Sequence, residues 1–99
     1  MIGKTLIVDD SLTVRMDLAE AFEAAGFQPL PCGTAAEARR ALAQDDPAVL
    51  ILDVILPDGD GIALLGELRA RATGGDLPVL LLSSEAEVRD RIQIGRAHV

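Results

Sequence analysis

The chain has 99 residues, of which 49% are hydrophobic and 25% are charged, and its formal net charge at pH 7 is -7. These values are typical of one small soluble domain with a single apolar core. The acidic balance and the presence of only two aromatic residues argue against nucleic-acid binding, which needs cations and stacking rings. No apolar run could cross a membrane, and a single cysteine, Cys32, cannot form an internal disulfide, so we expect a cytoplasmic protein.

Apolar runs and helical patterns alternate from the N-terminus onward. Residues 4–9 are a predicted strand, and Ser11 can cap the helix that follows it, which Gly26 ends. The periodic apolar positions of that helix are Leu12, Met16, Ala19 and Phe22. Residues 27–32 are a second strand, and its two prolines place it at a sheet edge because proline cannot donate to a ladder.

The same alternation continues to the end of the chain. Thr34 and Glu37 form a capping box for a second helix, and its inward positions are Ala38, Ala41 and Leu42. Residues 48–53 are a third strand, residues 54–60 a loop, and a third helix begins at Gly61. Its apolar stripe is Ile62, Leu65 and Leu68. Residues 78–84 are a fourth strand, and a further helix has Ser84 and Glu87 as its capping box and Val88 and Ile92 inside.

The third and fourth strands are apolar at nearly every position, which is typical of strands covered on both faces. Strands that alternate with helices predict an α/β fold, a parallel sheet with helices on both faces. In such sheets ligands bind beyond the carboxyl ends of the strands.

Acidic residues stand at those carboxyl ends. Asp9 and Asp10 end the first strand, Asp53 ends the third, and Ser83 and Ser84 end the fourth. Neighbouring strands would bring these groups into one crevice, where a divalent cation such as Mg²⁺ would neutralise the acids. Asp9 and Asp10 could instead serve only as helix caps, but a second buried strand that ends in an acid weakens that interpretation.

A metal beside carboxylates could support hydrolysis by a bound water or transfer of a phosphoryl group to an aspartate. The one histidine, His98, stands close to the C-terminus, and the chain has no glycine-rich phosphate loop with a lysine. The small site with one candidate aspartate nucleophile and one serine hydroxyl favours phosphoryl acceptance, and a metal-dependent phosphatase is less favoured.

Three motifs together resemble a known family: LIVDDS, LILDVILPDGDG and VLLLSS. Their order and spacing over nearly the whole chain are similar to those of the receiver domain of bacterial two-component response regulators. The resemblance implies a flavodoxin-like, doubly wound parallel sheet with strand order 2-1-3-4-5. It also implies that Pro57 and Gly61 belong to the loop after the phosphoacceptor.

The resemblance further implies a role for each site residue. Asp53 would take a phosphoryl group from a sensor histidine kinase or a phosphotransfer protein, and Ser83 would be the switch hydroxyl. Asp10, Asp53 and the backbone carbonyl of Ile55 would bind Mg²⁺ directly, with Asp9 acting through water. The domain would be a phosphoryl acceptor with at most self-catalysed transfer and dephosphorylation, not an enzyme.

The sequence departs from the family after the fourth strand. Residues 1–99 read as one receiver domain that stops before the fifth strand, and neither that strand with its lysine nor the fifth helix is present. The only lysine, Lys4, begins the first strand at the wrong end of the sheet to replace it. We therefore expect an output domain in a longer chain, and a homodimer that covers the exposed fourth strand. The alternative function is a receiver-like protein-interaction domain that is not phosphorylated.

Overall fold

The computed structural model describes residues 2–71 and 76–82. The elements in chain order are β1 (Gly3–Val8), α1 (Leu12–Ala24), β2 (Phe27–Cys32), α2 (Ala35–Gln44), β3 (Val49–Asp53), β4 (Ile55–Leu56), β5 (Gly59–Asp60), α3 (Gly61–Arg69) and β6 (Val79–Leu82). Ser83 and the helix predicted after it lie outside the described residues.

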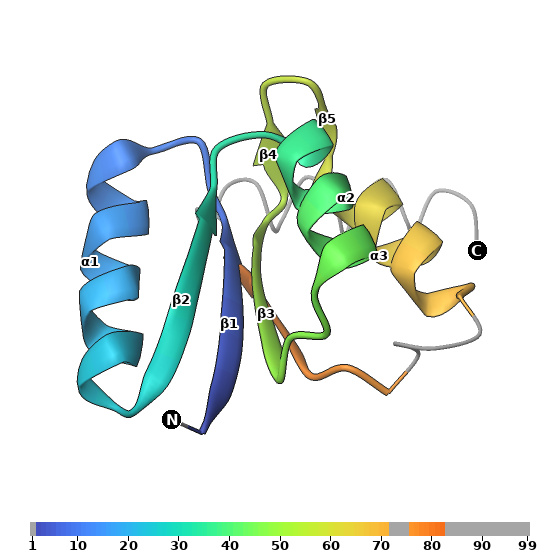
Figure 1. The fold of residues 1–99 in the computed structure, drawn as a ribbon. Helices are drawn as coiled ribbons and strands as arrows, with labels where there is room; N and C mark the ends of the chain where they lie inside the picture. Colours follow the sequence, from blue (N-terminus) through green and yellow to red (C-terminus); the bar gives the residue numbers. More distant parts are fainter. Residues whose placement is uncertain (1, 72–75, 83–99) are drawn as a thin grey trace.

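The main sheet has the strand order β2-β1-β3-β6, and each neighbouring pair is parallel. Since β6 is the fourth strand predicted from the sequence, this order confirms the predicted 2-1-3-4 arrangement. The proline-containing strand β2 lies at an edge of the sheet, as its composition predicts. Helix α1 lies on one face of the sheet, and α2 and α3 lie together on the other face (Figure 1).

The apolar core cluster lies between the sheet and the α2–α3 layer. Alternate residues of β1 and β3, including Leu6 and Leu50, point to this side and pack with Leu42 of α2 and Leu64 of α3. The predicted inward positions of α2 are confirmed, because Ala38 and Leu42 are buried and Ala41 packs against them.

The opposite face of the sheet, on the side of α1, is built differently. Thr5, Ile7 and Ile51 are fully buried on the α1 side of the strands, yet no residue of α1 is buried. The periodic apolar positions Leu12 and Met16 do not face the core, because they are 61% and 62% exposed. The helix contacts the sheet mainly at the edge strand β2, where Phe22 packs edge-to-face on Phe27 with ring centroids 5.7 Å apart.

The predicted helix caps at Ser11 and Thr34 are confirmed. The hydroxyls of Ser11 and Thr34 accept hydrogen bonds from the N–H groups of Val14 and Glu37, at 3.3 and 3.1 Å. Gly26 follows α1 with a φ of 98°, the left-handed conformation that glycine adopts most readily. The capping box differs in one detail, since the carboxylate of Glu37 accepts the N–H of Gly33 at 3.1 Å.

Two predictions around α3 need correction. Residues 54–60 are not an irregular loop, because β4 and β5 pair antiparallel and form a short hairpin. The apolar stripe of α3 includes Leu64 and Leu68, with Leu65 partly buried, whereas Ile62 is exposed. The start of the helix sets this rotation, because Gly61 lies directly against the backbone of Asp53.

Candidate metal centre

Strand register brings the acids of two strands to the same level. Val8 of β1 pairs with Leu52 of β3, so the next residues along each strand are Asp9 and Asp53. Both follow apolar residues that are fully buried in the sheet. The crevice at the carboxyl edge, predicted from the fold class, therefore begins with two carboxylates side by side.

Three carboxylates meet at this edge. One oxygen each of Asp9, Asp10 and Asp53 can be chosen so that all lie within 4.8 Å of one another. Asp9 is only 5% exposed, Asp53 is half-buried and Asp10 is exposed. Like charges at this distance repel, and burial of Asp9 adds a desolvation cost, so a cation would stabilise the cluster. Hard oxygen ligands are those that Mg²⁺ prefers, so the donor set fits this ion.

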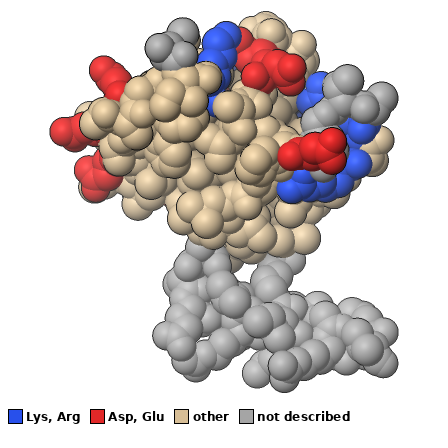
Figure 2. Space-filling view, turned by 90° about the horizontal axis from the view of Figure 1, so that it is seen from below, with Lys and Arg blue, Asp and Glu red and all other residues tan. Residues whose placement is uncertain are grey.

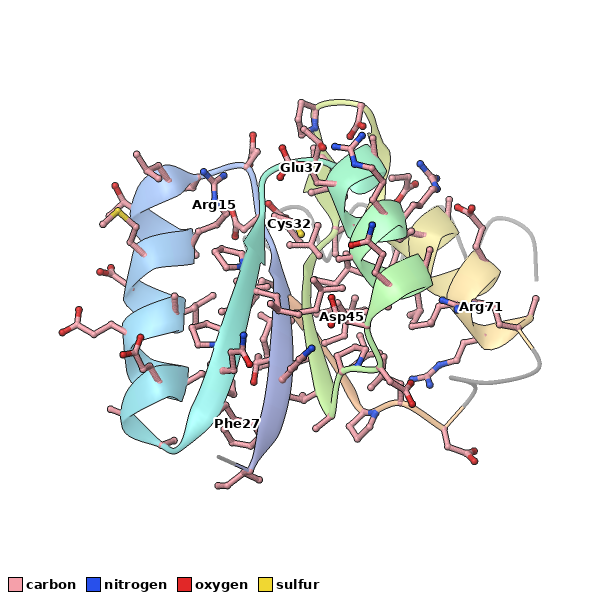
Figure 3. The ribbon with its side chains drawn as sticks, viewed as in Figure 1. Arg15, Phe27, Cys32, Glu37, Asp45 and Arg71 are labelled. Atoms are coloured by element: carbon pink, nitrogen blue, oxygen red, sulfur yellow. The ribbon has the colours of Figure 1, made fainter. Side chains whose placement is uncertain are left out.

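Asp9 is held in place by hydrogen bonds from three directions. Its carboxylate accepts the N–H of Ser11 at 2.8 Å, and its own N–H donates to the carbonyl of Cys32 at 3.0 Å. The guanidinium of Arg15 donates from Nη1 to the carbonyl of Asp9 at 2.8 Å. Figure 3 shows Arg15 at the upper end of α1, directed toward the carboxyl edge of the sheet.

Arg15 is the site residue that sequence reasoning missed. The only signal was its position one helical turn after the N-cap Ser11, on the same side of α1. An arginine on an exposed helix is ordinarily a solvated residue, so this spacing alone could not single it out.

Asp53 is the last residue of β3, and its neighbours are fixed by backbone hydrogen bonds. The N–H of Val54 donates to the carbonyl of Leu82 at 3.0 Å, and that of Gly61 donates to the carbonyl of Val54 at 2.7 Å. Ile55, on β4, donates its N–H to the Asp53 carboxylate at 3.2 Å. Ile55, whose carbonyl is the predicted metal ligand, is therefore also the residue whose N–H orients the carboxylate of Asp53, the predicted phosphoacceptor.

Gly61 is required by the close approach of two backbone segments. A Cβ built on Gly61 would lie 2.0 Å from the carbonyl oxygen of Asp53 and 3.0 Å from Cα of Val54. No side chain fits there, because real Cβ atoms do not approach a backbone oxygen so closely. The start of α3 is thereby pressed against the end of β3, which holds Asp53 at the edge of the sheet.

Neither Lys4 nor the thiol of Cys32 belongs to the cluster of three acids. Lys4, the second residue of β1, forms an ion pair with Asp45 and lies at the amino end of the sheet, in line with its predicted distance from the site. Burial, with a smaller contribution from Glu37, raises the pKa of the Cys32 thiol to about 11, so this cysteine is a packed core residue and not a nucleophile.

The family model of the response regulator receiver domain matches residues 5–99 of the chain. The chain belongs to this family. The receiver domain is 34% identical over 94 residues to the phosphate regulon transcriptional regulatory protein PhoB of Pseudomonas aeruginosa, covering 94% of this chain and 41% of PhoB. It is 35% identical over 89 residues to the response regulator MprA of Mycobacterium ulcerans, covering 90% of this chain and 38% of MprA.

Solved structures agree with this assignment. A putative response regulator from Chloroflexus aurantiacus is 31% identical with a TM-score of 0.83, over 91% of this chain and 74% of that one. The receiver domain of a signal transduction histidine kinase from Syntrophus aciditrophicus is 33% identical with a TM-score of 0.78, over 91% and 70%. Within residues 2–71 and 76–82, no helix has the length and apolar character needed to span a membrane.

Proposed function

We propose that this receiver domain accepts a phosphoryl group on Asp53 from a phosphohistidine of a sensor histidine kinase or a phosphotransfer protein. The observation that carries the proposal is the meeting of Asp53 with Asp9 and Asp10 within 4.8 Å, at the carboxyl edge of a receiver-family sheet. An exposed helix-cap role for the acids would not require a carboxylate from a second strand in the same cluster.

The transfer follows from the position of the Asp53 carboxylate. One of its oxygens forms a bond to phosphorus while the phosphorus–nitrogen bond of the phosphohistidine breaks. The bonding electron pair stays on the imidazole nitrogen, and Asp53 becomes an acyl phosphate. A bound Mg²⁺ would screen the negative charges of the carboxylates and of the incoming group. The domain is thus a phosphoryl acceptor rather than an enzyme that turns over another substrate.

The proposed metal ligands are Asp10, Asp53 and the carbonyl of Ile55, with Asp9 acting through water. Asp9 suits the indirect role because its carboxylate already accepts the N–H of Ser11. The exposed Asp10 suits direct ligation, because it can move onto an ion without losing buried contacts. Ser83, which follows β6, is the proposed switch hydroxyl.

Phosphorylation can be tested with a small phosphodonor and magnesium. We expect mass spectrometry to find one added phosphoryl group on the parent chain and none on Asp53→Asn. Asp17→Asn, which changes an exposed acid on α1 that is not part of the acidic cluster, is the control and should be labelled like the parent. Equal labelling of the parent and Asp53→Asn would reject Asp53. No labelling of the parent would favour the unphosphorylated interaction domain.

Metal binding can be tested by titration with Mg²⁺, followed through the NMR amide shifts of Asp10 and Asp53. Asp10→Asn removes a charged ligand and should weaken binding. The same change relieves repulsion within the acidic cluster, so it should also stabilise the metal-free domain. Unchanged shifts of the parent at millimolar magnesium would contradict the metal site.

We further propose that this receiver domain is part of a longer cytoplasmic protein. The chain spans 41% and 38% of the regulators PhoB and MprA, which fits a receiver joined to an output domain in a longer protein. A single buried thiol fits the cytoplasm.

Strand β6 is an edge in the described sheet and exposes Leu80 and Leu81, which favours a homodimer at high concentration. A monomer in sedimentation at about 100 µM would contradict the dimer, since standard interfaces of this kind bind more tightly than that.

A further inference from the structure

The tip of the β4–β5 hairpin is attached to a helix that is remote in sequence. Asp58 lies in the turn of the hairpin, and its two carboxylate oxygens accept the N–H groups of Ala35 and Ala36, at 2.7 and 3.0 Å. These are the first two residues of α2. Their N–H groups have no partner inside the helix, so a carboxylate is a favourable acceptor for them. Figure 1 shows the hairpin beside the N-terminal end of α2.

Helix α2 already has a cap from its own sequence. The hydroxyl of Thr34 accepts the N–H of Glu37 at 3.1 Å, and Asp58 takes two other N–H groups at the same helix end. The two caps are therefore not alternatives. Thr34 stabilises α2 alone, whereas Asp58 also determines where the hairpin lies. A Cβ built on Gly59 would be 3.6 Å from the methyl of the buried Ala35, so the hairpin backbone lies close against the helix.

The hairpin connects the phosphoacceptor strand to α3, and it carries Ile55. At its base, the Gly61 N–H donates to the carbonyl of Val54, and the Gly61 backbone lies against Asp53. At its tip, the carboxylate of Asp58 links the hairpin to α2 by two hydrogen bonds. A second link joins α2 to α3 beyond the hairpin, since Arg39 donates two hydrogen bonds to Glu67 at 3.1 and 2.7 Å.

We propose that Asp58 is a positioning residue of the metal centre, which holds the hairpin on α2 and thereby fixes the Ile55 carbonyl relative to Asp53 and Asp9. This inference rests on the proposed function, because it gives the hairpin a role in binding the metal. Without the carboxylate of Asp58, the tip of the hairpin loses its hydrogen bonds to α2, and the position of Ile55 relative to the acids is less fixed. The chain thus uses a helix outside the acidic cluster to order one of its ligands.

The attachment can be tested first in the metal-free domain by amide hydrogen exchange. Asp58→Ala removes both hydrogen bonds, and Asp58→Asn keeps one acceptor oxygen while removing the same charge. We expect the Gly61 N–H to exchange several-fold faster in Asp58→Ala and at an intermediate rate in Asp58→Asn. Thr34→Ala is the matched control, because it removes a cap of α2 and leaves the hairpin attached. Parent-like exchange of Gly61 in Asp58→Ala would overturn the attachment.

Magnesium affinity then tests the positioning role. We expect Asp58→Ala to bind Mg²⁺ about tenfold more weakly than the parent, at the low end of the loss caused by removing an outer partner of a metal ligand. Asp58→Asn should lie between them, and since both variants lose the same charge, their difference reports the hydrogen bond. Thr34→Ala should stay within about twofold of the parent.

Two results would overturn the positioning role. One is equal affinity in the parent and Asp58→Ala, and the other is a loss in Thr34→Ala as large as that in Asp58→Ala. A parent that binds no magnesium would instead reject the proposed function together with the positioning role. The Gly61 exchange rates would still decide separately whether Asp58 holds the hairpin.

Discussion

The two faces of the sheet are built differently. On the α2–α3 face, both helices bury apolar residues in one cluster with β1 and β3. On the α1 face, the strands bury Thr5, Ile7 and Ile51 completely, but α1 buries none of its own residues and exposes Leu12 and Met16. The first face has packed helices, and the second has a helix that rests on the edge of the sheet.

Hydrogen bonds and ion pairs between elements also differ between the two faces of the sheet. The described ion pair between helices joins α2 to α3, and Asp58 joins the hairpin to α2. Helix α1 presents acidic side chains outward, at the left of Figure 2. Its link to the site is the bond from Arg15 to the carbonyl of Asp9. The α2–α3 face therefore positions the hairpin that follows Asp53, whereas α1 helps to hold Asp9 at the end of β1.

The largest expected difference is between apolar residues of the two helical layers. Leu64→Ala in α3 removes a side chain that is 2% exposed, so it should lower the free energy of unfolding by about 3–4 kcal/mol. Met16→Ala in α1 removes one that is 62% exposed and should change it by less than about 0.5 kcal/mol. Urea denaturation measures both. Similar losses in the two variants would mean that α1 packs as tightly as α3.

A pair of glycines in α3 separates the side that faces the site from the side that faces away. Gly61→Ala places a methyl group 2.0 Å from the carbonyl oxygen of Asp53, and overpacking of this kind should cost about 3 kcal/mol. Gly66→Ala meets no atom within 4 Å and should stabilise the helix by about 0.5–1 kcal/mol. We expect Gly61→Ala to lower the midpoint of thermal unfolding and Gly66→Ala to raise it. A tolerated Gly61→Ala would show that α3 can move away from β3.

A substitution of Thr5, on the α1 face of the sheet, should have a smaller effect on stability. Its hydroxyl is buried and has no hydrogen-bond partner among the described residues. Thr5→Val keeps the branched shape and removes the unpaired polar group, so it should stabilise the domain by about 1 kcal/mol. Thr13→Val, at an exposed position of α1, is the control and should have little effect. Destabilisation by Thr5→Val in chemical denaturation would show that the hydroxyl has a partner after all.

The smallest effect concerns pH and the attachment of the hairpin. The N–H groups of Ala35 and then Ala36 lower the pKa of the Asp58 carboxyl below its ordinary value of 3.8. A lowered pKa in the folded state means that the unfolded chain binds the proton more readily. The contribution of Asp58 is therefore complete above about pH 4 and disappears as pH falls through the folded pKa.

Urea midpoints from pH 7 down to pH 3 can detect this contribution. Asp58→Asn should be less stable than the parent at neutral pH, and the two midpoints should converge as the solution becomes more acidic. The contribution of Glu67 to stability should also disappear at acidic pH, because its hydrogen bonds and ion pair with Arg39 lower its pKa. A difference between parent and Asp58→Asn that stays constant down to pH 3 would contradict the role of the carboxylate charge.

Much of this molecule could be read from local sequence patterns. The alternation of strands and helices, the edge position of the proline-rich strand, and the caps at Ser11 and Thr34 were all predicted, and the structure confirms them. These features depend on residues near one another in the chain. The grouping of Asp9, Asp10 and Asp53 also followed, because the carboxyl ends of parallel strands share one edge.

The tertiary structure alone decided the features that depend on contacts between distant segments. The rotation of α3 follows from Gly61 against Asp53, and the attachment of Asp58 to Ala35 joins residues 23 positions apart. Leu12 and Met16 show the same limit, because a helical apolar stripe does not reveal whether a sheet lies beneath it. Periodicity along a segment specifies which side chains share a face, but only packing determines what that face contacts.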